Sequence, residues 1–266
     1  MTAQTFGLGF PNLIYDATVA GGSWLAAAPV SNVQTRPLAN TARSSSVASA
    51  DTKITIDHGS AKAARALVLL RHNLTSAATV RWKRGTTAGG TDVADSGDVN
   101  AWQFTPRAFD GSVYDAQILL TSQASARYET IEIVDTANSA GYIEVGRVMV
   151  CPLFEPTWNP SYGLRDGHED LSEVGMAYSG ADWPTANNRP RTVQFALQFL
   201  TLAEGDTLHE MEQIEGTTEE VLYLPYTDTP ARMQRYGMVG LLRELSGIEY
   251  PTVNTRSRGF SIRQRK

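Results

Sequence analysis

Hydrophobic and polar residues alternate along most of the patterned segments of this 266-residue chain. Such alternation is typical of β-strands with one buried face, because successive side chains of a strand point to opposite sides. In residues 53–57 the isoleucines Ile54 and Ile56 share one face, and Val80 and Trp82 share a face of a later run. The pattern predicts a mainly β chain with few helices.

Other segments extend this pattern. Residues 66–70 are apolar throughout, which predicts a strand covered on both faces. Turn-forming residues at 57–60 predict that the preceding strand ends there, and strand-like runs resume at 114–120, 128–135 and 142–150. Strands spaced in this way are expected in a β-sandwich or jelly roll.

The residue composition of the chain changes near its middle. Pro152, Pro156 and Pro160 punctuate a stretch that is also rich in aromatic and turn-forming residues. A chain of this length is about right for two modest domains, each with its own core. We therefore expect a jelly-roll β-sandwich over 1–155 and a second β-rich domain over 156–266.

The second domain contains the clearest half-buried strand, at residues 192–199. There the residues at every second position are apolar and are expected to share one face: Val193, Phe195, Leu197 and Phe199.

The only clear helix signal follows that strand. Thr207 and Glu210 have the spacing of a capping box, and Gly216 is placed to end a short helix of about ten residues. Residues 237–245 fit either a strand or a short helix.

Composition excludes several classes of protein. The formal net charge of −5 gives no basic surface for nucleic acid, and no uninterrupted apolar stretch is long enough to span a membrane. The single cysteine, Cys151, excludes an internal disulfide and a zinc site built from several thiolates. Its apolar surroundings favour a buried small side chain over a reactive thiol.

Signatures of catalysis and cofactor binding are absent from the sequence, and we expect no catalytic residue, no cofactor and no metal. The densest set of candidate ligands is Asp166 with His168, Glu169 and Asp170, which could hold a cation or form an exposed polar loop. Three aspartates at 92, 95 and 98 have the spacing of a calcium loop but lack its terminal glutamate.

Three tryptophans lie in turn-rich surroundings and are candidates for carbohydrate contact: Trp24, Trp102 and Trp183. The alternative is that each fills part of a core. The C-terminal tail is basic in an otherwise acidic chain, so its charged residues could pair with a neighbouring copy or be solvated. These candidate inter-subunit residues are Arg256, Arg258, Arg263, Arg265 and Lys266.

The first domain resembles the galactose-binding-like, or discoidin-type, jelly roll over roughly residues 10 to 155. The resemblance is carried by Asn12-Leu13-Ile14 and by the segments 54–57, 66–74, 80–82 and 142–148. Extracellular members often carry a disulfide that one cysteine cannot provide.

A jelly roll followed by the crossing 154–164 resembles structural proteins of tailed phages. The segments 191–199 and 221–225, with the helix between them, are similar to the ring-forming domain of distal tail or upper baseplate proteins. This resemblance implies a structural component of the virion tail, made in the host cytoplasm. Its implied partners are copies of itself in a ring, commonly sixfold, and other tail proteins, with no catalytic residue.

Two other functions stay open. A carbohydrate-binding module for attachment to the host surface would place exposed aromatic residues together at one end of the jelly roll. A glycan-degrading enzyme would need two carboxylates about 5 to 10 Å apart in a groove.

Overall fold

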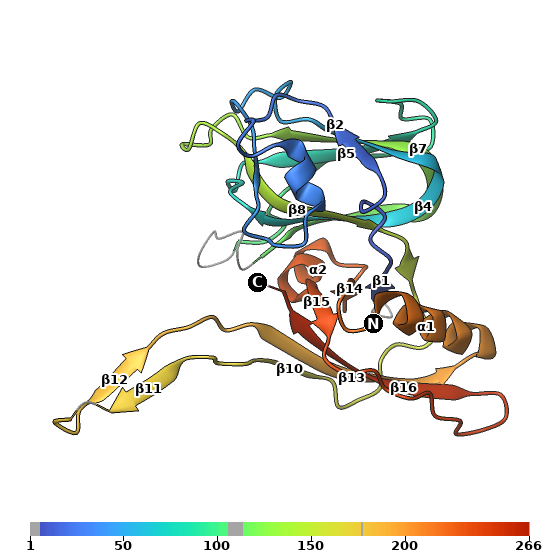
Figure 1. The fold of residues 1–266 in the computed structure, drawn as a ribbon. Helices are drawn as coiled ribbons and strands as arrows, with labels where there is room; N and C mark the ends of the chain where they lie inside the picture. The colour runs from blue at the N-terminus through green and yellow to red at the C-terminus, as the bar shows by residue number, and fades with distance from the viewer. Residues whose placement is uncertain (1–5, 106–113, 177, 266) are drawn as a thin grey trace. The chain divides into compact units, whose positions relative to one another are not determined.

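The structure, a computed structural model, describes residues 6–105, 114–176 and 178–265 (Figure 1). These residues form a mainly antiparallel β structure with two α-helices and one 3-10 helix. The mainly β fold class expected from the alternating pattern is confirmed.

The chain divides into two compact units. Unit 1 comprises Met1–Glu155 and Leu222–Met238, and unit 2 comprises Pro156–Val221 and Val239–Lys266. The later part of the chain thus returns to unit 1 for a short segment before it completes unit 2, a return that the sequence pattern does not reveal.

Unit 1 is built on one large antiparallel sheet in the strand order β3-β8-β4-β7-β5-β6, with β2 paired to β4. The bounds are β2 Thr18–Ala20, β3 Ala42–Arg43, β4 Ile54–His72, β5 Thr79–Gly85, β6 Ala94–Asn100, β7 Ala116–Val134 and β8 Glu144–Cys151; a 3-10 helix, η1, spans Val30–Gln34.

The core of unit 1 consists of the residues that alternation places on one face. Ile54, Ile56, Val80 and Trp82 are all fully buried in it. Residues 66–70 are buried at every position, as expected for a strand covered on both faces.

Strands β4 and β7 are longer than the sequence pattern indicates. The turn-forming residues 57–60 do not end β4: they form a bulge, at which Gly59 adopts a φ of 70° and donates its N–H to the Asp57 carboxylate. Likewise the runs predicted at 114–120 and 128–135 fall largely in the single strand β7, Ala116–Val134, because the polar residues between them continue the pairing through Lys62–Ala64. The two strands bend together around the core (Figure 1).

A buried charged cluster lies beside this bend. Arg84 and Glu129 are fully buried and form an ion pair with 3.0 Å between Nη2 and Oε1. The Arg84 guanidinium also donates to the carbonyls of Lys62 and Ala64, each at 2.8 Å, and the indole of Trp82 donates to Glu129 at 3.0 Å. The cluster satisfies carbonyl groups next to the bulged stretch.

Unit 1 is completed by three short strands and a helix. β1 (Gly7–Gly9) pairs with β9 (Leu153–Phe154) on one side and with the end of β14 (Glu220–Leu224) on the other. Helix α2 (Pro230–Tyr236) is held by Gln234, whose amide donates to the carbonyls of Ala101 and Asp115.

Unit 2 is a smaller antiparallel sheet in the order β10-β13-β16-β15. The bounds are β10 Arg165–His168, β13 Arg191–Leu200, β15 Met238–Leu242 and β16 Arg256–Gln264, and a separate two-stranded ribbon consists of β11 Glu173–Met176 and β12 Asp182–Thr185. The segment that fitted either a strand or a helix, 237–245, therefore contains a strand.

Helix α1 (Leu202–Glu215) packs on β13 and β16 of unit 2. Its capping box uses Thr201 and Glu204, so the box predicted at Thr207 and Glu210 is wrong: Thr207 lies inside the helix and its hydroxyl donates to the carbonyl of Ala203. The helix is consequently longer than expected and ends at Gly216, as predicted.

The buried pair in unit 1 generates the first prediction. Glu129→Gln leaves the buried Arg84 charge without compensation and should lower the free energy of unfolding by about 3 kcal/mol, measured by urea denaturation of the full chain. The matched control is Glu132→Gln in the same strand, which removes a partly exposed pair with Lys83 and should cost less than about 1 kcal/mol. Equal losses for the two variants would contradict a structural role for the buried cluster.

The second prediction concerns Glu215, which is buried at the end of α1. Burial, with a smaller contribution from Glu219 and Glu220, raises the pKa of its carboxyl from 4.5 to about 7. A carboxyl with a raised pKa holds its proton more tightly in the folded state, so stability is greatest at low pH and falls as pH rises from 4.5 through 7.

Glu215→Gln should therefore raise the free energy of unfolding at about pH 8 by about 2 kcal/mol and change it little at about pH 4. Urea denaturation across this pH range measures the difference. Glu210→Gln, at an exposed position of the same helix, is the control and should leave the pH dependence as it is in the unchanged chain.

Candidate functional site

The acidic cluster near residue 168 is explained by ion pairs. Its three carboxylates each lie against an arginine of unit 2, and the pairs are Asp166 with Arg191, Glu169 with Arg263 (3.0 Å) and Asp170 with Arg189 (3.0 Å). His168 lies exposed in β10. Among the described residues no group of three or more histidine, cysteine, aspartate or glutamate side chains could hold a metal ion.

Of the three aspartates at 92, 95 and 98, the first two have structural partners. Asp92 accepts the backbone N–H and the hydroxyl of Thr86, which closes the loop between β5 and β6. Asp95 pairs with Arg81 across these strands at 2.6 Å. Both arrangements hold the pKa of the aspartate concerned below its ordinary value, so the two carboxylates are charged at neutral pH.

The three candidate tryptophans are not brought together. Trp102 is buried, and its indole donates to the carbonyl of Leu74 at 2.9 Å. Trp24 packs against the core of unit 1 with its indole donating to Lys53. Trp183 lies in unit 2 and is 71% exposed, so it is the one of the three whose ring is free to contact another molecule.

The basic tail is largely paired within unit 2. Arg258 is buried against Glu212 of α1, Arg263 pairs with Glu169, and Arg265 pairs with Glu220. Arg256 differs, because its guanidinium stacks on the ring of Tyr250 at 4.1 Å and makes no ion pair with a described acidic residue. Lys266 lies outside the described residues. Contact of these residues with a neighbouring copy stays a prediction.

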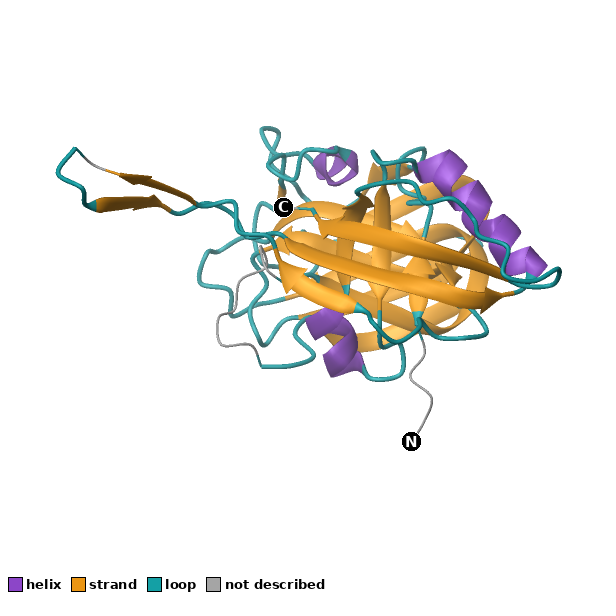
Figure 2. Cartoon of the chain, turned by 90° about the horizontal axis from the view of Figure 1, so that it is seen from below, coloured by secondary structure: helices purple, strands orange, loops and turns teal. Residues whose placement is uncertain are grey.

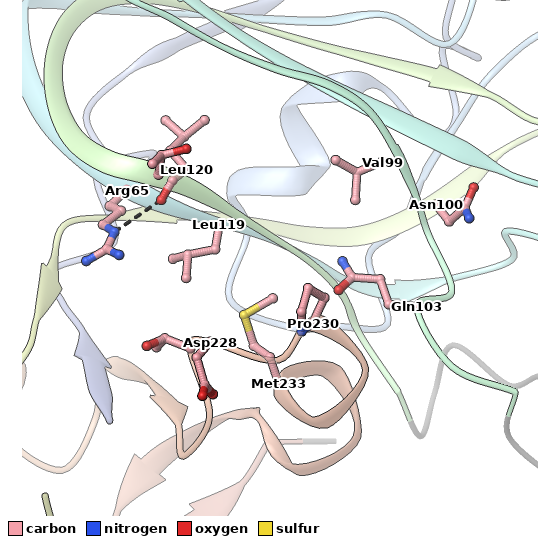
Figure 3. Close-up of a pocket in the computed structure, with 11 residues that line it drawn as sticks. Arg65, Val99, Asn100, Gln103, Leu119, Leu120, Asp228, Pro230 and Met233 are labelled. Carbon is pink, nitrogen blue, oxygen red and sulfur yellow. Dashed lines mark hydrogen bonds between the residues drawn. The ribbon is translucent and has the colours of Figure 1, made fainter. Parts of the chain in front are cut away.

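A cavity of about 490 Å³ lies in unit 1 beside α2. Leu119, Pro230 and Met233 border it together with Gln103, and Arg65 at one side donates to the carbonyl of Leu120 (Figure 3). Asp228 is the one carboxylate among its lining residues, so this cavity lacks the pair of carboxylates that glycoside hydrolysis requires.

A shallower groove of about 330 Å³ lies on the sheet of unit 2. Residues of β13 and β16, among them Phe195 and Phe260, line it, and Tyr162, Arg165 and Glu244 also border it. The ring of Tyr162 is fully exposed. An aromatic ring beside polar groups is a common way to hold a sugar, although the groove again offers a single carboxylate.

Exposed apolar side chains are concentrated in unit 2. Of the large hydrophobic residues exposed in the described chain, all but Leu25, Val134 and Tyr236 belong to unit 2, which is the shorter part of the chain. Scattered exposed apolar residues are ordinary, whereas a concentration of them marks a surface that contacts another molecule. Most of those in unit 2 lie in two regions.

The first group lies on the two-stranded ribbon and its connections, residues 171–176 and 178–188, which we call the arm. The arm extends away from the rest of unit 2 in both views (Figures 1 and 2), and every residue of β11 and β12 is exposed. Val174 and Met176 project from one face, and Trp183, opposite Gly175, projects from the other. An isolated two-stranded ribbon is only marginally stable in water, so the arm is suited to pack on a partner.

The second group lies where β13 ends and β16 begins, at the opposite end of these strands from the arm. We call it the end patch, and its members are Trp158, Phe199, Leu202, Tyr250 and Val253. Contacts of neighbouring residues bring the three segments to this end of the sheet: Leu200 pairs with Arg256, the Arg256 guanidinium stacks on Tyr250, and Thr157 donates its N–H to the Glu204 carboxylate of α1.

Phe199 reaches this patch through an irregularity in its strand. The sequence pattern places Phe199 on the buried face with Val193, Phe195 and Leu197, and for Phe199 this is wrong. A bulge between Leu197 and Leu200 gives Phe199 a φ of 60°, which turns its ring outward to 64% exposure and buries Leu200 in its place. The left-handed conformation is costly for a bulky residue, so backbone strain accompanies the exposure of this ring.

Sequence reasoning therefore missed most of the two apolar groups. The arm could have been noticed from Val174, Met176 and Trp183 within a polar, turn-rich stretch. The end patch had no such signal, because it is assembled from three separate segments and depends on the bulge at Phe199.

No helix in the described part of the chain is both long and apolar enough to cross a membrane. No protein-family model matches the chain, and no curated protein matches it.

Several solved structures resemble part of the chain. CBM32-1 from a family 31 glycoside hydrolase of Clostridium perfringens aligns with 53% of this chain and 98% of its own, at 15% identity and a TM-score of 0.41. Chitosan-binding module 1 of a chitosanase/glucanase from Paenibacillus sp. IK-5 aligns with 53% and 98%, at 16% identity and a TM-score of 0.38. A family 89 glycoside hydrolase from Clostridium perfringens aligns with 54% of this chain and 15% of its own, at 11% identity and a TM-score of 0.40. At scores and identities this low, the likenesses carry no conclusion about function.

Proposed function

We propose that this chain is a structural protein that assembles with copies of itself through unit 2. The observation that carries the proposal is the concentration of exposed apolar side chains on the arm and the end patch. Trp183, Met176 and Phe199 are large side chains of the kinds that dominate protein interfaces. Left in water they would favour aggregation, whereas contact between copies covers them.

The resemblance to distal tail and upper baseplate proteins suggests where such an assembly would be located. In that setting unit 2 forms a ring within the tail of a phage particle, and unit 1 is a galactose-binding-like jelly roll attached to it. Other tail proteins are then its further partners. Mass spectrometry of purified phage tails tests this location, because the chain should be present there in a fixed ratio to the tube protein.

The native mass of the full chain tests self-assembly. We expect light scattering and native mass spectrometry to give the mass of two or more chains of 28.9 kDa each. Burial of large apolar side chains at the contact supplies the free energy. A chain that stays monomeric throughout a concentration series would overturn the proposal.

Carbohydrate binding is the second candidate, and the groove beside Tyr162 is the observation that favours it. The full chain should then bind members of a glycan array, because the exposed ring can stack on a sugar while Arg165 and Glu244 bond to hydroxyl groups. Tyr162→Ala should weaken binding at least tenfold, about 1.4 kcal/mol. Leu25→Ala, in unit 1, is the control, and an array without any positive glycan would remove this candidate.

A further inference from the structure

We propose that the groove on the sheet of unit 2 binds a sugar that carries a carboxylate, and that Arg165 is the residue that selects it. The inference rests on carbohydrate binding in this groove, the second function proposed above, and it does not depend on self-assembly. It assigns Arg165 to the carboxylate of the ligand in place of a hydroxyl group.

Arg165 borders the groove with a guanidinium that has no partner among the described residues. It is exposed in β10, and its side chain makes no hydrogen bond, ion pair or ring contact with any of them. Arg189, by contrast, is neutralised by Asp170 at 3.0 Å. A free guanidinium presents its N–H groups as a planar fork, which matches the two oxygens of a carboxylate better than it matches a single hydroxyl group.

The carboxylates that come next along the chain are already compensated. Asp166 pairs with Arg191. Glu169 lies between Arg263 at 3.0 Å and Arg243 at 3.4 Å, so two guanidinium groups share one negative charge. A ligand carboxylate held beside β10 therefore faces no uncompensated acidic side chain from residues 161–170.

Two further carboxylates lie near the β15 side of the groove. Glu244 borders the groove just after β15 and makes no ion pair or hydrogen bond with a described residue, and Glu249 accepts the hydroxyl of Ser257 at 3.1 Å. Three strand spacings, about 14 Å, separate β10 from β15 in the order β10-β13-β16-β15. Salt largely screens exposed charges across such a distance, so repulsion of a carboxylate held beside β10 is small.

Tyr162 and Arg165 lie along the same edge of β13. Ser161 donates its N–H to the carbonyl of Ala196 at 2.9 Å, and Arg165 pairs with Gln194. Two residues of β13, about 7 Å, separate these contacts, a span that one sugar ring bridges. A ring stacked on Tyr162 can thus direct its carboxylate to Arg165.

The floor beyond this edge suits the uncharged part of a sugar. Gln194 of β13 lies opposite Ser261 of β16, and both line the groove. Neither side chain makes a hydrogen bond with another described residue. The next pair across the strands is Ala196 with Gly259, and a Cβ added at Gly259 would meet nothing closer than 4.0 Å. The floor therefore offers both hydrogen bonds and space.

Isothermal titration calorimetry of the full chain with matched sugars makes the test. The probes are a trisaccharide of galacturonic acid and a sialylated trisaccharide, each compared with the same compound after its carboxylates are reduced to alcohols. Arg165→Gln removes the charge and keeps a polar side chain. The matched control is Arg189→Gln, which removes the same charge from the same unit, at an exposed ion pair whose loss costs little stability.

We expect the unchanged chain to bind at least one acidic probe at least about tenfold more tightly than its reduced form, since a charge-assisted contact to a carboxylate is stronger than one to a hydroxyl group. Arg165→Gln should abolish this preference and leave the affinity for the reduced form within about twofold. Arg189→Gln should keep the preference. Raising the salt concentration from about 50 to about 500 mM should reduce it.

Three results would overturn the inference while carbohydrate binding stands. The first is that neither acidic probe binds more tightly than its reduced form, and the second is a preference that survives Arg165→Gln. The third is displacement of the acidic probe by an equal concentration of inorganic phosphate, because the site would then recognise an anion without the sugar. If neither the probes nor any glycan of the array binds, carbohydrate binding itself is removed.

Discussion

The pairing of β13 with β16 is the interaction on which unit 2 depends. It places Val193, Phe195 and Ile262 on the face that α1 covers, and it fixes the distance between the arm and the end patch. Antiparallel pairing over this length leaves little freedom in register, because a slip of one residue would expose the buried face. The buried pair of Arg258 with Glu212 then attaches α1 to this sheet.

In unit 1 the two long strands β4 and β7 bend, and a buried charged cluster forms hydrogen bonds with the backbone beside the bend. Arg84 supplies donors to the carbonyls beside the bulge, and Glu129 neutralises it within the core. Such a cluster is costly to bury and costly to break, so it specifies this bend over alternatives that lack it. Unit 1 thus uses a buried charged cluster to stabilise its bent strands, whereas unit 2 leaves large apolar side chains exposed.

Period-two alternation predicted the strands whose partners are regular, and it failed where the backbone departs from regular pairing. Ile54, Val80 and Trp82 are buried as expected. The residues 57–60 and Phe199 are where prediction failed, because a bulge adds a residue to one strand and reverses the faces beyond it. The capping box was misplaced for a different reason. Two Thr-x-x-Glu sequences, beginning at Thr201 and Thr207, fit the pattern, and the spacing alone does not show which of them begins the helix.

The base of the arm has a consequence for the exposed side chains that the arm carries. The ion pair of Asp170 with Arg189, and the hydrogen bond from Leu171 N–H to the carbonyl of Asn188, close the ribbon where it leaves the sheet. Both partners of the ion pair are more than half exposed, and pairs of this kind contribute little to stability. The contacts at the base therefore fix the direction of the arm only weakly, and a molecule bound along the ribbon would determine it.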